Sequence, residues 1–127
     1  MTTKKTKVLV VDIQKKLLYD SEISGYEDIV KLLDCEWLDV VERKLNQQEG
    51  YFTIYVDDIG KLVGKHISAV SPTTGEYLVG NILISLTNDE GEPVSLTDEQ
   101  MNDIIFKSTV SVIDENDGDI YPLLILE

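Results

Sequence analysis

Short apolar runs alternate with polar turns along the whole chain. Residues 7–13 form the first run, which is rich in β-branched side chains and predicts a buried strand. Residues 16–23 predict a second strand, and residues 37–45 and 51–56 predict two more. Along residues 51–56, apolar or aromatic side chains occupy both alternating sets of positions, so both faces of this strand are partly apolar.

The pattern continues into the second half of the chain. Residues 76–86 predict one long strand, in which Gly80 marks a bulge or a close backbone approach. Residues 88–91, NDEG, predict a turn. Residues 109–113 and 120–126 flank the polar segment ENDGD and predict a C-terminal β-hairpin.

Two segments have the pattern of a capped amphipathic helix. Ser24 and Glu27 fit a capping box that opens a helix to about Leu33. The apolar residues of that helix fall on one face: Tyr26, Ile29, Val30 and Leu33.

A second capping box, Thr97 to Gln100, opens a helix to about Lys107. Its expected buried stripe consists of Met101, Ile104 and Ile105. Two short helices and six to eight strands joined by short turns predict an α+β fold with a largely antiparallel sheet. With 127 residues and no linker or repeat, we expect a single domain over residues 1–127.

The charge is unevenly distributed along the chain. The net charge is −13, and residues 87–127 carry 11 acids against one base, Lys107. Such a region repels nucleic acid and anionic lipid, so we expect a protein partner with a basic or neutral surface. The simpler interpretation is an acidic surface that keeps the protein soluble. The expected partner-binding acids are Asp89, Glu90, Glu92, Asp98, Glu99, Asp103, Asp114, Glu115, Asp117 and Asp119.

Composition also limits the location and the chemistry of the protein. Cys35 is the single cysteine, which excludes an internal disulfide and fits a reducing cytosol. No apolar run reaches the length of a membrane helix, and the N-terminal apolar run is too short for a signal peptide. We therefore expect a cytoplasmic protein.

No catalytic or metal-binding constellation is visible in the sequence. Adjacent Asp57 and Asp58 would point to opposite faces of a strand, and their position before Gly60 is typical of a turn. Residues 114–119, DENDGD, fail the spacing of an EF-hand loop. His66 has no serine or cysteine motif around it. We expect no catalytic residue, no metal and no cofactor.

A small group of basic residues follows the aspartate pair. Lys61, Lys65 and His66 stand together in an otherwise acidic chain, and Arg43 would lie near them if the two central strands pair. These four residues are the candidate site for an anionic, nucleotide-like small molecule. The alternative is that they are ordinary exposed turn residues.

The stretch VGNILISLTNDEGEPVSLTDEQMNDI, residues 79–104, resembles the family called domain of unknown function 3846. The N-terminal KVLVVD and the segment GYEDIVKLLDCEWLDVVERKL are similar to it in order and length. The resemblance covers about residues 6–107 and leaves the hairpin at about 108–127 outside. An Asn-Arg pair that family members often carry is missing here, where the chain has KHISAV from Lys65. The family's occurrence in phages, plasmids and Gram-positive bacteria implies an accessory protein of a mobile element.

Three functions follow as hypotheses. The first is a non-catalytic accessory protein that binds and inhibits a host factor, including a factor of host defence, through its acidic residues, either directly or as a mimic of DNA. The second is a protein that sequesters a nucleotide-like signal. A small hydrolase is the least supported, and the oligomeric state is left open.

Overall fold

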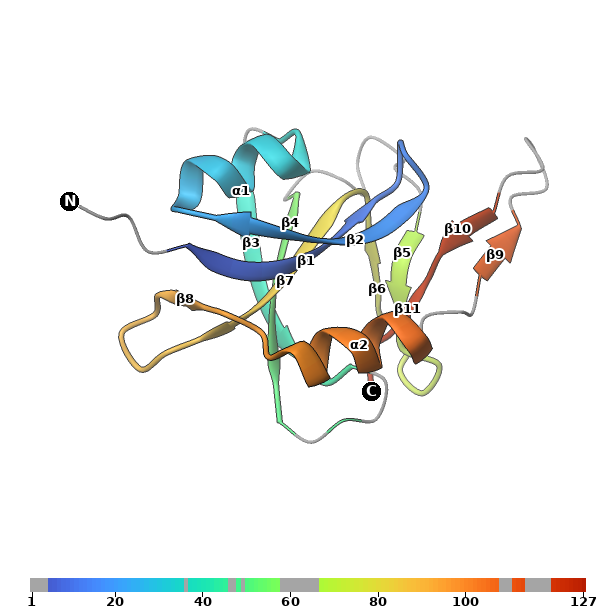
Figure 1. The fold of residues 1–127 in the computed structure, drawn as a ribbon. Coiled ribbons are helices and arrows are strands. Elements are labelled where there is room, and N and C mark those ends of the chain that lie inside the picture. Colours follow the sequence, from blue (N-terminus) through green and yellow to red (C-terminus); the bar gives the residue numbers. More distant parts are fainter. Residues whose placement is uncertain are drawn as a thin grey trace.

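The computed structural model describes residues 5–35, 37–45, 48, 50–57, 67–107, 111–113 and 120–127. Figure 1 shows the fold. The elements in chain order are β1 (Thr6–Asp12), β2 (Leu17–Ile23), α1 (Tyr26–Leu33), β3 (Leu38–Arg43), β4 (Phe52–Asp57), β5 (Ile67–Val70), β6 (Tyr77–Val79), β7 (Ile82–Thr87), β8 (Pro93–Val94), α2 (Asp98–Lys107), β9 (Ser111–Ile113), β10 (Ile120–Pro122) and β11 (Leu124–Ile125).

The main sheet has the strand order β2-β1-β7-β4-β3, and β8 pairs with the end of β7. All of these pairings are antiparallel. A smaller sheet has the order β11-β5-β6, in which β11 runs parallel to β5. The two helices and the mostly antiparallel pairing confirm the predicted α+β class.

The central strands β1, β7 and β4 of the main sheet are buried on both faces, which explains their continuous apolar runs. Alternate residues of one strand point to opposite faces. Val8, Val10, Tyr55 and Leu83 pack with Ile29 and Leu33 of α1. Leu9, Val11, Ile54, Val56, Ile82 and Ile84 pack instead with Met101 and Ile104 of α2 and with Ala69, Leu78 and Leu124 of the smaller sheet. The two helices therefore lie on opposite faces of the main sheet (Figure 1).

The second predicted capping box is confirmed. The Gln100 N–H donates to Thr97 Oγ1 at 3.1 Å, and the Thr97 N–H donates to Gln100 Oε1 at 2.9 Å. The helix that follows ends at Lys107, as predicted. Its stripe is narrower than expected, because Ile105 is 40% exposed whereas Met101 and Ile104 are buried.

The first predicted capping box is wrong. Gly25, not Ser24, is the N-cap of α1, and no side chain caps this helix. The Ser24 N–H donates instead to Asp28 Oδ2 at 2.8 Å. Tyr26 is also 54% exposed, so the buried side of α1 is centred on Ile29 and Leu33.

The long strand predicted over residues 76–86 is two strands in different sheets. Gly80 has a φ of +74°, which a residue with a side chain adopts only at a cost. At this point the chain leaves β6 in the smaller sheet and enters β7 in the main sheet. The run at residues 120–126 is divided in the same way. Its first part, β10, pairs with β9 as the predicted hairpin, and its last part, β11, joins β5.

Candidate functional site

Three of the predicted partner-binding acids lie on the turn between β7 and β8. Asn88 organises this turn, since its Oδ1 accepts from the Glu90 and Glu92 N–H groups at 3.0 Å each. The Gly91 N–H donates to the Asn88 carbonyl at 3.0 Å, and Gly91 has a positive φ of 81°. The side chains of Asp89, Glu90 and Glu92 are exposed. The predicted turn is confirmed, and it presents three carboxylates to solvent.

The next three acids lie on α2. Asp98 and Glu99 occupy its first turn, where negative charge is favourable, and both are exposed. Asp103, one turn later, is half-buried. Asp98 Oδ1 lies 3.9 Å from Lys7 Nζ, but side-chain exposures of 82% and 54% make this a weak pair.

The side of α2 that points away from the core carries an aromatic residue. Met101 and Ile104 hold the helix on the core, while Phe106 is 78% exposed. A cavity of about 310 Å³ beside the helix is lined by Gln48, Glu99, Gln100 and Asp103. The outer side of α2 therefore combines carboxylates, a hollow and an exposed ring.

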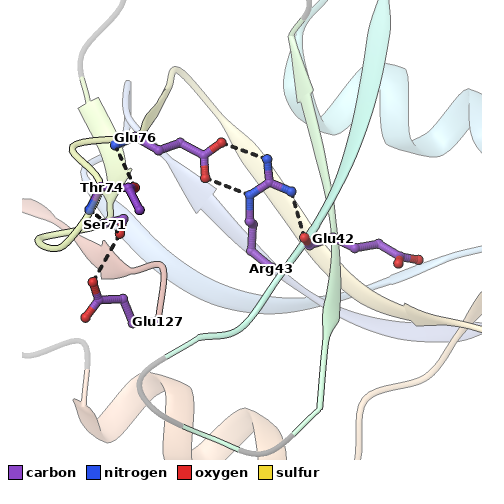
Figure 2. A network of polar contacts seen from close by, with 6 residues as sticks. All are labelled: Glu42, Arg43, Ser71, Thr74, Glu76 and Glu127. Atoms are coloured by element: carbon purple, nitrogen blue, oxygen red, sulfur yellow. Dashed lines mark hydrogen bonds and ion pairs between the residues drawn. The ribbon is translucent and has the colours of Figure 1, made fainter.

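Arg43, one of the four predicted ligand-binding residues, is held by its own chain. Its Nε and Nη2 donate to the two carboxylate oxygens of Glu76 at 2.6 and 2.7 Å, and its Nη1 donates to the Glu42 carbonyl at 2.7 Å (Figure 2). The hydrogen bonds to Glu76 raise the pKa of Arg43, against an opposing effect of burial. The pair connects β3 to the residue that precedes β6. Arg43 thus makes a structural ion pair with Glu76.

A cleft of about 210 Å³ lies between the β3–β4 pair and β6. It is lined by Asp39, Val41, Val56, Asp57, Glu76, Tyr77, Leu78 and Val79. Cavities that hold small organic ligands usually begin at about 300 Å³. The size and the carboxylates of the described lining disfavour a nucleotide-like anion in this cleft.

The rest of the predicted basic group, Lys61, Lys65 and His66, lies outside the described residues, as does Asp58. The residues that flank this segment are Asp57 and Ile67. Asp57 pairs with Leu38, at the end of β3 opposite to Arg43. Ile67 pairs with Val79, at the end of β6 remote from Glu76. A common site for Arg43 and the other three residues stays a prediction, and both described flanks lie at strand ends away from Arg43.

Asp114, Glu115, Asp117 and Asp119 also fall outside the described part of the chain, so their share in an acidic surface stays a prediction. Within the described ranges, no group of three or more His, Cys, Asp or Glu residues has a geometry that could hold a metal ion. No helix among the same residues is long and apolar enough to cross a membrane.

Two features of these surfaces were not predicted from the sequence. Glu76 was not singled out, because its partner Arg43 lies 33 positions away and no local pattern links them. Phe106 was also missed, although a signal existed. Two positions along a helix correspond to about 200° of rotation, so Phe106 lies nearly opposite Ile104, the most buried residue of α2.

Comparison with protein families agrees with the resemblance seen in the sequence. The family described as domain of unknown function (DUF3846) matches residues 5–109. The chain belongs to this family. The match includes the main sheet, both helices, and the smaller sheet except β11. No curated protein and no solved structure matches the chain.

Proposed function

We propose that this member of the DUF3846 family is a non-catalytic binding protein that attaches to a basic surface of another protein and inhibits it. The phage or mobile-element setting implied by the family resemblance makes a host protein, including a defence protein, the proposed target. The cytoplasm is the proposed location, since the single cysteine suits a reducing compartment.

One observation supports this proposal above the others. Five acids are exposed: Asp89, Glu90, Glu92, Asp98 and Glu99. The first three lie on the β7–β8 turn and the other two on the first turn of α2, and local hydrogen bonds hold both turns in place. Residues 87–107 contain six acids and one lysine. Preorganised charge of one sign favours association with a surface of the opposite sign and disfavours other partners.

The test compares two triple variants with the same change in charge. In the first, Asp89, Glu90 and Glu92 on the β7–β8 turn are replaced by lysine. In the second, the exposed Asp20, Glu22 and Glu27 on β2 and α1 are replaced by lysine. A bacterial protein captured by the wild type is purified, and its affinity and activity are measured with each variant.

We expect the β7–β8 turn variant to lose at least about tenfold in affinity, equivalent to about 1.4 kcal/mol, and to lose inhibition. The β2 and α1 variant should retain both. Equal behaviour of the two variants would show that the acids act only through net charge or solubility, and would refute the proposal.

A further inference from the structure

We propose that the outer face of α2, defined by Glu99, Asp103 and Phe106, docks an arginine-bearing segment of the partner, with Phe106 as its aromatic anchor. This inference rests on the proposed function, because it assigns the partner's contact residue and the element that receives it. The ring would add an apolar contact to the electrostatic attraction of the acids.

Phe106 is the most exposed large apolar side chain among the described residues, at 78%. The helix beneath it is held by Met101 and Ile104, which are 7% and 0% exposed, and by the Thr97–Gln100 capping box. The ring is therefore presented on a formed helix that packs against the core, which lowers the backbone ordering that binding requires. Aromatic anchors of this kind supply much of the affinity at protein interfaces.

The two carboxylates stand in line with the ring along the helix. Glu99 and Asp103 are four positions apart, and Asp103 and Phe106 are three apart, so the side chains are successive neighbours on one face. The cavity of about 310 Å³ is lined by both of these acids. Gln48 and Gln100 complete its described lining, and Phe106 does not take part in it, so the cavity offers space beside the acids for an arginine whose side chain continues along the helix to the ring.

Arginine suits this arrangement better than lysine. A guanidinium stacks on an aromatic ring while it pairs with carboxylates in a planar geometry, whereas an ammonium is more strongly hydrated. The protein uses the carboxylate part of this chemistry internally, where the Arg43 guanidinium binds Glu76 through two hydrogen bonds of 2.6 and 2.7 Å. The acidity of residues 87–107 disfavours nucleic acid and anionic lipid as occupants.

The test uses two fluorescein-labelled probes, deca-arginine and deca-lysine, titrated with the full chain at physiological salt and followed by fluorescence anisotropy. We expect the wild type to prefer deca-arginine. Phe106→Ala should weaken deca-arginine binding by about 2- to 5-fold, the range of an exposed cation–π contact, and should remove the preference. Phe106→Leu, which keeps an apolar side chain without the ring, should also remove the preference.

Matched controls separate the docking face from general charge. Trp37→Ala removes another aromatic residue that is 66% exposed and should leave both affinities unchanged. Glu99→Lys should weaken binding several-fold, whereas Glu27→Lys, in the first turn of α1, should not. Circular dichroism and urea unfolding check that each variant is folded.

The outcomes distinguish this inference from the proposed function. If Glu99→Lys weakens binding but both Phe106 variants behave as wild type, the anchor is refuted and the acidic surface stands. If Phe106→Ala changes only self-association in sedimentation equilibrium, or only binding to phosphatidylcholine vesicles, the face serves a second copy or a membrane and the inference is overturned. If Glu99→Lys and Glu27→Lys act equally, the inference is again overturned.

Discussion

The two helices start from the same sequence signature and differ in how they begin and in what they expose. In α2 the hydroxyl of Thr97 and the amide of Gln100 cap the helix as the motif requires. In α1 the corresponding serine stands one residue before the N-cap, and Asp28 accepts from its backbone N–H. A capping motif thus indicates a helix start to within about one residue, and the structure shows which residue begins the helix.

The surroundings of the two helices differ as well. Tyr26 of α1 contacts the buried Tyr55 edge-on, with ring centroids 6.2 Å apart and planes inclined by 76°. On α2, Phe106 is mostly in solvent, whereas Ile104, two positions before it, is fully buried. The exposed aromatic residue of α1 therefore contacts a residue of the main sheet, while that of α2 is mostly exposed to solvent.

The largest expected effect on stability comes from removing the buried side chains that hold each helix on the core. Ile29 and Ile104 are both fully buried, so Ile29→Ala and Ile104→Ala should each lower the free energy of unfolding by roughly 2–5 kcal/mol. Phe106→Ala should change it by less than about 0.5 kcal/mol, because the ring packs little against the fold. Urea unfolding measures all three. A large loss for Phe106→Ala would mean that the ring stabilises the fold.

The second prediction concerns the pH dependence of stability, which comes from a tyrosine on the α1 side of the main sheet. Burial, together with the neighbouring Tyr26, raises the pKa of Tyr55 to about 12. The unfolded chain then loses this proton near pH 10 while the folded chain retains it, so stability falls as the pH rises from 10 to 12. A difference of two pKa units corresponds to about 2–3 kcal/mol over that interval.

Tyr55→Phe should remove this part of the alkaline destabilisation. Tyr19, whose pKa is also raised by burial and by Asp12, titrates in the same direction, so the wild type and the variant are compared at each pH. Unfolding in urea at pH 8, 10 and 12 gives the two curves. Parallel curves would show that Tyr55 is not the group responsible.

The smallest effect tests the two helix starts directly. Thr97→Ala removes a formed cap and should cost about 1 kcal/mol, whereas Ser24→Ala removes a hydroxyl that caps nothing and should stay within about 0.5 kcal/mol. Thermal unfolding followed by circular dichroism is sensitive enough for both. Equal losses would indicate that Ser24 caps α1 in solution.

Much of the fold follows from local patterns, but two predicted strands were each divided between sheets. Nothing in EYLVGNILISL shows that the chain changes sheets at Gly80, since the division requires pairing partners far away in sequence. The buried Asn81 shows how remote these partners are. Its Oδ1 accepts from the Ile13 N–H at 2.8 Å, and its Nδ2 donates to the Leu32 carbonyl at 3.5 Å.

The features of the candidate site likewise fall into those that local sequence predicts and those that it does not. The positions and sign of the acids were evident in the sequence, and the turn at Asn88 and the start of α2 were predicted with them. The ion pair of Arg43 with Glu76 was not predictable, because it joins β3 of the main sheet to the residue that precedes β6 of the smaller sheet. The helical spacing of Phe106 from Ile104 indicates that Phe106 is exposed, but its apolar side chain is of the kind usually expected in the core.

The sequence by itself determined the α+β class, the buried strands, the NDEG turn, the capped start of α2 and the acidic character of residues 87–107. These features depend on contacts within a few residues or on composition, so the local sequence is enough to predict them. Only the tertiary structure decided where two strands divide between sheets and where Arg43 is bound. Each of these depends on groups that are distant in sequence and meet only when the two sheets and the helices pack together.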